Sequence, residues 1–459
     1  MTDIGSTAQP QSAPQHQSTE AQSAPQAQSS ARPHPATRSI DDIVVLEVGA
    51  PGHGGFCVAR LDGQAVFVRH ALPGETVRCR ITEVRPSYLR ADAIHVLEAS
   101  PDRVPAPCPH AGAGKCGGCD WQHVALPAQR ALKAQVIVEQ FRRLAGMDVV
   151  VDVEECGAPD GLGWRTRVGF AVDAQGRAGL RRHRSHDIHP IDTCLIAHPA
   201  VSELGVTDLP WPGAGSVEAI VSSTGQRAIV VEARRSQTVA PHHPDPTVAV
   251  ARRHKRDIVM YDGDATVTER AAGRDWRVSL QSFWQIHPAS PETLVSTVHE
   301  YAAVQKGDHV LDLYAGVGLF AGALAALAGP SGRVVAVESS PAAVEDAVAN
   351  LGETVDVRRA LVEPGLVRAI STEMARVDVV VLDPPRAGAG RGVVEDIAAA
   401  APRAVVYVAC DPAALARDVA SFATLGYRLE ALRAFDLFPM TAHVECVALL
   451  VPSAATAAG

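Results

Sequence analysis

The sequence lacks any apolar run of the ~18 or more residues that a membrane helix needs, and its N-terminus lacks the basic-then-apolar pattern of a secretory signal. It also lacks an excess of positive charge, because 42 Lys and Arg stand against 51 Asp and Glu, for a net charge of -9. Phosphate binding is driven by Lys and Arg, so any nucleic-acid site must be a local basic patch. We expect a cytosolic protein without a membrane partner.

The composition changes along the chain in a way that predicts a tail and three domains. Residues 1–40 have almost no large apolar side chains and are expected to be a disordered tail. Short apolar runs cut by Gly and Pro over 41–98 predict a small β-barrel. Residues 99–276 predict a mixed α+β central domain, with a helix from Pro127 to Leu144. Alternating strands and Ala-rich helices over 277–455 predict an α/β, doubly wound Rossmann-like domain.

The predicted barrel carries the first resemblance to a known family. A glycine turn followed by an apolar strand, then LPGETV, then a strand ending in basic residues resembles a TRAM (OB-like) domain, which binds RNA. Any small barrel is the alternative. The resemblance implies that RNA backbone contacts come from the barrel's arginines, which are Arg69, Arg78, Arg80, Arg85 and Arg90.

The segment HVLDLYAGVGLF predicts a cofactor site. A buried strand ends near Asp312, and Gly316 and Gly318 let the backbone approach a ligand at the strand's carboxyl end. The next strand ends in Glu338, which could hold a ribose. A dinucleotide-binding site is the competitor, but Ala321 stands at the third glycine position of its fingerprint. The pattern instead resembles the first motif of S-adenosylmethionine methyltransferases.

Two more strand ends carry reactive side chains. DPPR places Asp383 and Arg386 after one apolar strand, and Cys410 follows another, while His443 and Glu445 stand just ahead of the last strand. A cysteine at a strand end is often only a small buried apolar residue. Beside a methyl donor, however, a thiolate can add to carbon 6 of uracil and make carbon 5 nucleophilic, and a carboxylate can then remove the carbon 5 proton.

Five ordered motifs resemble the RNA 5-methyluridine methyltransferases. Here the motifs read FWQIH, DLYAGVG, DPPRAG, YVACDPAALARD and FPMTAHVE. The family has Asn where this chain has His287, and Asn where it has Asp411. An ionised Asp411 would disfavour the neighbouring thiolate.

The resemblance implies S-adenosylmethionine-dependent methylation of carbon 5 of a uridine in ribosomal or transfer RNA, for which a monomer is adequate. It assigns Cys410 as the nucleophile and Glu445 as the proton acceptor. It implies a donor and uracil pocket, with supporting side chains, made of Gln285, Tyr314, Gly316, Glu338, Asp383, Phe283, Arg386 and His443. Two alternatives remain: an amino-group methyltransferase, since DPPR resembles the loop of such enzymes, and a non-catalytic RNA-binding protein on the same scaffold.

Three of the nine cysteines crowd into one short segment, as Cys108, Cys116 and Cys119. In a reducing compartment such a cluster predicts metal ligands before disulfides. The family resemblance implies that Cys194 completes a four-iron four-sulfur (4Fe-4S) cluster. A structural zinc site is the rival.

The arginine-dense stretch from Trp164 to Arg184 lies between these cysteines. It could grip phosphates while a base is drawn out of its stack. A solvated charged hairpin is the alternative reading.

Overall fold

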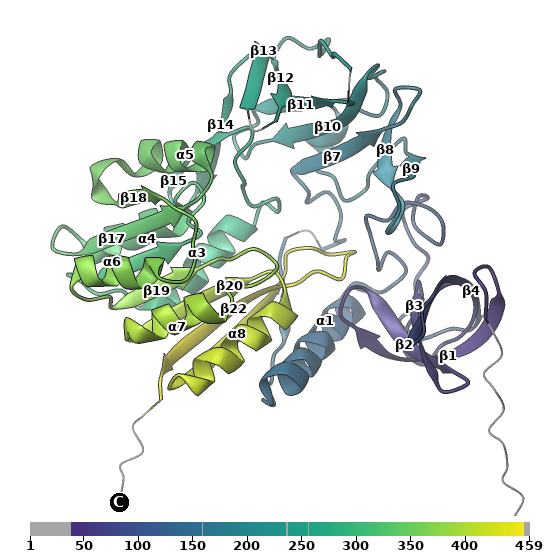
Figure 1. The fold of residues 1–459 in the computed structure, drawn as a ribbon. Coiled ribbons are helices and arrows are strands. Elements are labelled where there is room, and N and C mark those ends of the chain that lie inside the picture. Colours follow the sequence, from purple (N-terminus) through teal and green to yellow (C-terminus); the bar gives the residue numbers. More distant parts are fainter. Residues whose placement is uncertain (1–37, 158, 236, 256, 454–459) are drawn as a thin grey trace, which may run out of the picture. The chain divides into compact units, whose positions relative to one another are not determined.

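The computed structural model describes residues 38–157, 159–235, 237–255 and 257–453. Nearly all of the predicted tail therefore lies outside the described residues. The described residues from Ser39 to Ser453 form one compact unit. Figure 1 shows its arrangement, with a barrel, a central sheet and a larger sheet covered by helices.

The first five strands close into the predicted barrel in the order β1-β2-β3-β5-β4. In β4, Val77, Cys79 and Ile81 are fully buried, whereas Arg78 and Arg80 between them are exposed. This alternation is what a strand with one face on a core requires. The strands are β1 (Ile43–Gly52), β2 (Phe56–Leu61), β3 (Gln64–Arg69), β4 (Thr76–Val84) and β5 (Tyr88–Glu98).

A seven-stranded sheet follows, in the order β13-β12-β11-β10-β7-β8-β9. One face of this sheet and the short helix α2 (Pro199–Ser202) enclose a separate apolar core. Only β11 and β12 pair in parallel. The strands are β7 (Arg167–Val172), β8 (Ala178–Arg181), β9 (Ile188–Pro190), β10 (Ala214–Val221), β11 (Arg227–Ala233), β12 (Val248–His254) and β13 (Asp257–Asp262).

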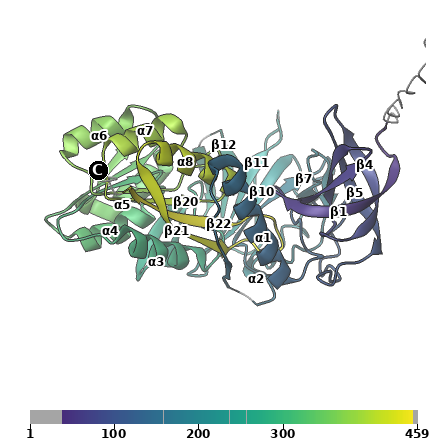
Figure 2. The same cartoon turned by 90° about the horizontal axis from the view of Figure 1, so that it is seen from below.

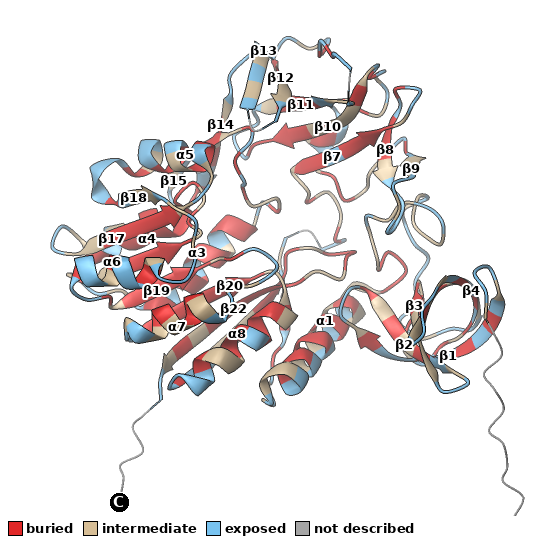
Figure 3. Ribbon diagram, in the orientation of Figure 1, coloured by how far each residue is buried: buried red, intermediate tan, exposed pale blue. Residues whose placement is uncertain are grey.

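The C-terminal part is built on an eight-stranded sheet in the order β18-β17-β16-β19-β20-β22-β21-β6. Strands β16 to β20 are parallel, and β22 returns antiparallel to β20. The strands are β6 (Val153–Glu155), β16 (His309–Leu313), β17 (Arg333–Glu338), β18 (Asp356–Arg359), β19 (Val379–Leu382), β20 (Ala404–Ala409), β21 (Tyr427–Asp436) and β22 (Glu445–Pro452). All residues of β19 and β20 are buried, as expected for strands covered on both faces (Figure 3).

Helices cover both faces of this sheet, which confirms the doubly wound fold. Val310 of β16 belongs to the apolar core on the side of α3 and α4, and its neighbour Leu311 belongs to the core on the side of α6, α7 and α8. The helices are α3 (Ser290–Ala302), α4 (Leu319–Ala328), α5 (Pro341–Leu351), α6 (Leu366–Met374), α7 (Arg391–Ala399) and α8 (Pro412–Thr424). A single 3₁₀ turn, Gly352–Thr354, follows α5.

The helix predicted over 127–144 is confirmed as α1 (Leu126–Gln140), which continues into a π-helical turn, Phe141–Ala145. Ile137 and Phe141 are fully buried in the core that α8 covers. Figures 1 and 2 place α1 beside α8. Helix α1 thus packs against the C-terminal sheet, and β6 is an edge strand of that sheet. The boundaries between the central and C-terminal domains that the sequence predicts remain a proposal.

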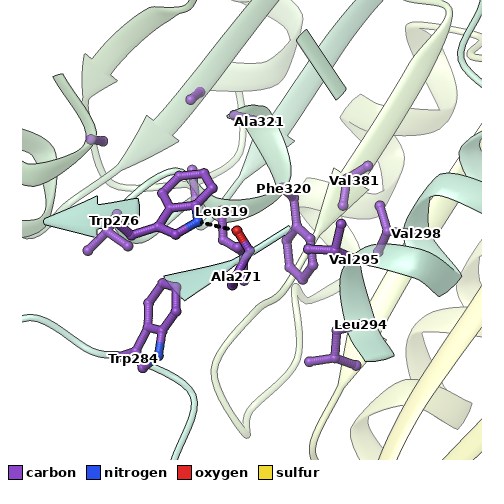
Figure 4. Close-up of a cluster of buried hydrophobic side chains, with 14 of the residues drawn as sticks. Ala271, Trp276, Trp284, Leu294, Val295, Val298, Leu319, Phe320, Ala321 and Val381 are labelled. Atoms are coloured by element: carbon purple, nitrogen blue, oxygen red, sulfur yellow. Dashed lines mark hydrogen bonds between the residues drawn. The ribbon is translucent and has the colours of Figure 1, made fainter. Parts of the chain in front are cut away.

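The hairpin of β14 (Thr266–Ala271) and β15 (Arg274–Ser279) is anchored to the same sheet by tryptophan. The indole N–H of Trp276 donates to the carbonyl oxygen of Ala271 at 3.0 Å, and Trp276 packs in one core with Trp284, Leu319 and Phe320 (Figure 4). Because Trp284 directly precedes Gln285, this packing fixes where the FWQIH segment enters the site.

No helix in the described part of the chain combines the length and the apolar character that crossing a membrane requires.

Candidate active site

The glycine turn of the candidate cofactor site follows strand β16. Tyr314, Gly316 and Gly318 all have positive φ angles, of 62°, 55° and 94°. A Cβ on Gly318 would lie 2.6 Å from the Leu351 side chain, so this position requires glycine for space as well as for backbone conformation. Glu338, at the end of β17, accepts the N–H of Gly316 at 3.0 Å. The glycine turn and Glu338 are therefore in direct contact, as the sequence predicts.

Three carboxyl groups stand at the carboxyl ends of β16, β17 and β19: Asp312, Glu338 and Asp383. Asp312 is fully buried, and its Oδ2 accepts the N–H of Ala321 at 2.8 Å. Its Oδ1 is buried without a partner. Burial raises the pKa of Asp312 to about 8, with a further contribution from Asp383 and Glu338 that the Ala321 bond opposes. Such a cluster favours a positively charged ligand.

Cys410 opens into a small cavity of about 150 Å³. It follows β20 directly and is half-buried. The cavity brings the cysteine together with residues from five other segments of the chain. Its lining is Gly118, Trp164, Arg165, Ile286, Arg386, Cys410, Phe438, Thr441 and His443. Aromatic and apolar walls with a few charged groups suit a flat, polar ring.

Glu445, the first residue of β22, is buried at 4% exposure and acts electrostatically on Cys410. Burial, then Glu445 and Asp383, raise the pKa of the Cys410 thiol to about 11, and Arg386 opposes them. Burial and Asp383 also raise the pKa of Glu445, again against Arg386. A thiol and a carboxyl group with raised pKa values therefore share one site.

Arg386 and His443 meet at the rim of the cavity, with Nη2 and Nε2 3.2 Å apart. Burial, followed by the charge of Arg386, lowers the pKa of His443 to about 4. The imidazole is therefore neutral at neutral pH, and its Nε2 can accept the guanidinium N–H.

The loop that leads from β21 to Glu445 is held by α1 and by the segment that follows Cys119. The side-chain Oε1 of Gln129 on α1 accepts the N–H of Met440 at 2.8 Å, and the backbone N–H of Trp121 donates to the Met440 carbonyl oxygen at 3.0 Å. Asp120 accepts the N–H of Ala442 at 3.2 Å and also pairs with Arg69 of the barrel at 3.1 Å. The cysteine-rich segment thus braces the loop that carries His443.

The four predicted ligand cysteines line one cavity of about 80 Å³; they are Cys108, Cys116, Cys119 and Cys194. All nine cysteines of the chain are free. In residues 38–453, the three undescribed positions aside, no group of three His, Cys, Asp or Glu side chains is arranged to hold a metal ion. Gly118 and Arg165 line both this cavity and the one at Cys410, so the two cavities share a wall.

The two departures from the family motifs have different surroundings. His287 is buried at 2% exposure, its ring stacks on Trp164 with centroids 5.8 Å apart, and its Nδ1 accepts the N–H of Ala289 at 3.1 Å. Burial lowers its pKa to about 4, and Nε2 has no partner. Asp411 caps α8, accepting the N–H groups of Ala413 at 3.0 Å and Ala414 at 2.9 Å.

Several residues named in the sequence analysis have surroundings that the motifs do not indicate. Phe283 is 66% exposed, whereas Gln285 is half-buried beside Trp284. Arg69, expected to contact RNA, is buried and paired with Asp120. Trp164 precedes β7, and it lines the cavity at Cys410.

Sequence reasoning missed three lining residues of that cavity: Ile286, Phe438 and Thr441. The signal was present, because Ile286 lies inside FWQIH, and Phe438 and Thr441 lie inside FPMTAHVE.

Comparisons with known proteins agree with this architecture. The TRAM domain model matches residues 40–94, and the tRNA (uracil-5-)-methyltransferase model matches residues 245–452. An uncharacterized RNA methyltransferase of Streptomyces avermitilis is 51% identical over 89% of this chain and 98% of its own length. One from Streptomyces coelicolor is 50% identical over 89% and 93%.

A solved structure also matches this chain over most of its length. The tRNA (uracil-54, C5)-methyltransferase of Pyrococcus abyssi, in complex with S-adenosyl-L-homocysteine, matches with a TM-score of 0.65 at 25% identity, covering 88% of this chain and 99% of that one. The chain therefore belongs to the RNA (uracil-5-)-methyltransferase family, and it carries an N-terminal TRAM domain.

Proposed function

We propose that this protein methylates carbon 5 of a uridine in folded RNA through a transient bond between Cys410 and carbon 6. The observation that carries the proposal is the cavity at Cys410, where a thiol, a guanidinium and a neutral imidazole surround a space for a flat ring. A uracil ring flipped out of its stack would stack on Trp164 or Phe438.

In the proposed reaction the Cys410 thiol first loses its proton to solvent. Its sulfur then forms a bond to carbon 6, and the electron pair of the 5,6 double bond becomes available at carbon 5. Carbon 5 then takes the methyl group, and the methyl–sulfur bond of the donor breaks. Glu445 accepts the carbon 5 proton, the sulfur–carbon 6 bond breaks, and the double bond reforms. A carboxylate with a raised pKa is a stronger base than an ordinary one, which suits Glu445 to this step.

The methyl donor that fits this site is S-adenosylmethionine, which supplies an electrophilic methyl group on a positively charged sulfur. The unpartnered Oδ1 of Asp312 and the carboxyl groups of Glu338 and Asp383 favour a cation at the strand ends. Glu338 would bind the ribose, and the backbone at Gly316 would pass close to the ligand. Gln285 and Tyr314 would complete the walls of the donor site.

The RNA class is the finer part of the proposal. The Pyrococcus abyssi relative acts on a transfer RNA, and we infer a transfer or ribosomal RNA here, encountered in the cytoplasm. Arg165, which lines the cavity, would hold the phosphate beside the flipped base, and the exposed arginines Arg78 and Arg80 of the barrel would contact more distant backbone.

Release of tritium from RNA labelled at carbon 5 of uridine tests the reaction. We expect one tritium released for each methyl group transferred, because carbon 5 must lose its hydrogen. An amino-group methyltransferase would transfer methyl groups and leave the tritium in the RNA. A non-catalytic RNA-binding protein would do neither. Sequencing the methylated RNA then identifies the uridine.

We also propose that Cys108, Cys116, Cys119 and Cys194 hold a four-iron four-sulfur cluster. All four line one cavity, which is the donor set such a cluster takes. Burial raises the pKa of the Cys119 thiol to about 12, and Cys194, Cys116 and Cys108 add to this effect against the Gln122 hydrogen bond. Thiolates there would need a positively charged centre to stabilise them.

Anaerobic purification tests the cluster. We expect brown protein containing iron and acid-labile sulfide in equal amounts, and colourless protein from a Cys194→Ser variant. Colourless wild-type protein that contains stoichiometric zinc would contradict the cluster and would show that the four cysteines form a structural zinc site.

A further inference from the structure

A contact between the barrel and the helix after Cys410 is not explained by the family motifs. The imidazole Nε2 of His53 lies 3.1 Å from Oδ2 of Asp411. His53 lies in the turn between β1 and β2, and Gly54 and Gly55 that follow it have φ angles of 101° and 82°. Only glycine adopts such angles readily, so the turn is built to present this histidine.

Asp411 uses its two carboxylate oxygens for two different purposes. Oδ1 accepts the N–H groups of Ala413 and Ala414 at the start of α8, whereas Oδ2 faces His53. The carboxylate is therefore fixed in both position and rotation. Cys410 is the preceding residue, so this contact also fixes the backbone that carries the thiol.

The charges around Cys410 give the contact an electrostatic role. Burial, then Glu445 and Asp383 and, least, Asp411 raise the pKa of the Cys410 thiol, and Arg386 opposes them. Burial by itself would raise the pKa of Asp411, but the hydrogen bond from His53 and the two amides of α8 lower it further than burial raises it. Asp411 is thus ionised, and its charge requires a partner.

We infer that His53 is a positioning residue for Cys410, acting through Asp411. It docks the β1–β2 turn of the barrel on the first turn of α8 and offsets the negative charge that Asp411 places beside the thiol. His53 and Asp411, the aspartate that stands where the family has asparagine, then act together on Cys410. The inference rests on the proposed function only in taking Cys410 as the nucleophile.

Other charged groups surround His53 and must be held constant in any test. Glu139, Arg142 and Arg143, from α1 and its π-helical turn, line the same groove of about 750 Å³ as His53. The side chain of His53 is 40% exposed, so His53→Ala leaves the core unchanged. Asp411→Asn keeps a side-chain oxygen that can accept the N–H groups of Ala413 and Ala414.

The test is the rate at which Cys410 reacts with iodoacetamide in the full-length protein, followed by mass spectrometry of the Cys410 peptide across a range of pH. No RNA and no methyl donor are present, so the result is independent of whether methylation occurs. The variants are His53→Ala, Asp411→Asn and the double variant. His95→Ala, an exposed histidine on the same barrel, is the matched control.

We expect His53→Ala to slow alkylation about two- to fivefold and to move the Cys410 profile to higher pH, because an uncompensated charge remains beside the thiol. Asp411→Asn should speed alkylation, and adding His53→Ala to it should change nothing more. His95→Ala should match wild type. Two results would overturn the inference. In one, His53→Ala slows alkylation of Cys410 equally in the wild-type protein and in the Asp411→Asn variant; in the other, it slows alkylation in neither.

Discussion

The ammonium of Lys133 lies 2.5 Å from the carboxylate of Asp436, with the two side chains 0% and 3% exposed. Lys133 also donates to the carbonyl oxygen of Phe438 at 3.1 Å. This buried pair joins α1 to the end of β21, directly before the loop that carries His443. Burial lowers the pKa of Lys133, and Asp436 opposes that effect.

Replacement of Lys133 by Met should therefore destabilise the protein. It leaves a buried carboxylate without a partner, which costs about 3–5 kcal/mol in the free energy of unfolding. Urea unfolding measures the loss. A Lys133→Met/Asp436→Leu double variant should recover most of it, since both charges are then gone.

The exposed pair Arg391–Glu395 is the matched control, with side chains 79% and 43% exposed. Glu395→Gln should change stability by about 0–1 kcal/mol. If Lys133→Met lowered the free energy of unfolding by no more than Glu395→Gln does, the buried pair would not stabilise the loop that carries His443.

Asp312 should make stability depend on pH in a predictable direction. Its pKa is raised from 3.8 to about 8 in the folded protein, so its contribution is fully present below pH 3.8 and is lost as the pH rises through 8. Asp312→Asn keeps an oxygen to accept the Ala321 N–H but cannot ionise.

The stability difference between Asp312→Asn and wild type should therefore move in favour of the variant, by a few kcal/mol, between about pH 5 and pH 9. Chemical unfolding of both proteins at the two pH values measures it. A difference that stays constant over this range would show that Asp312 does not titrate there.

Glu445→Gln should separate methyl transfer from release. The amide cannot accept the carbon 5 proton, so the methylated RNA should remain bonded to Cys410 and accumulate as a denaturant-resistant complex. A denaturing gel with labelled RNA measures this. The Glu445→Gln/Cys410→Ser double variant should give no such band. Normal turnover by Glu445→Gln would remove Glu445 from the role of base.

The strand ends of the C-terminal sheet were predictable from the sequence because reactive residues followed apolar runs. Asp312, Glu338, Asp383 and Cys410 all stand at carboxyl ends of parallel strands, as expected. Such ends converge at one edge of the sheet whatever the details of the loops. The closed barrel was predictable for a similar reason, since its alternating pattern needs only one apolar face.

Long-range contacts were not predictable in this way. Nothing local in the sequence indicates that Trp164 and Arg165 reach the cavity at Cys410, or that His53 meets Asp411. These contacts depend on how separate sheets dock. The exposure of Phe283 was likewise not predictable, because a motif does not indicate which way each side chain points.

The covalent bond between Cys410 and the pyrimidine is the central claim, and RNA containing 5-fluorouridine tests it most directly. Fluorine at carbon 5 cannot leave as a proton does, so in the presence of S-adenosylmethionine the wild-type protein should form a stable complex whose digestion yields the nucleotide attached to the Cys410 peptide. Cys410→Ser should form none. Attachment to another cysteine, or full methylation activity of Cys410→Ser on ordinary RNA, would contradict the account.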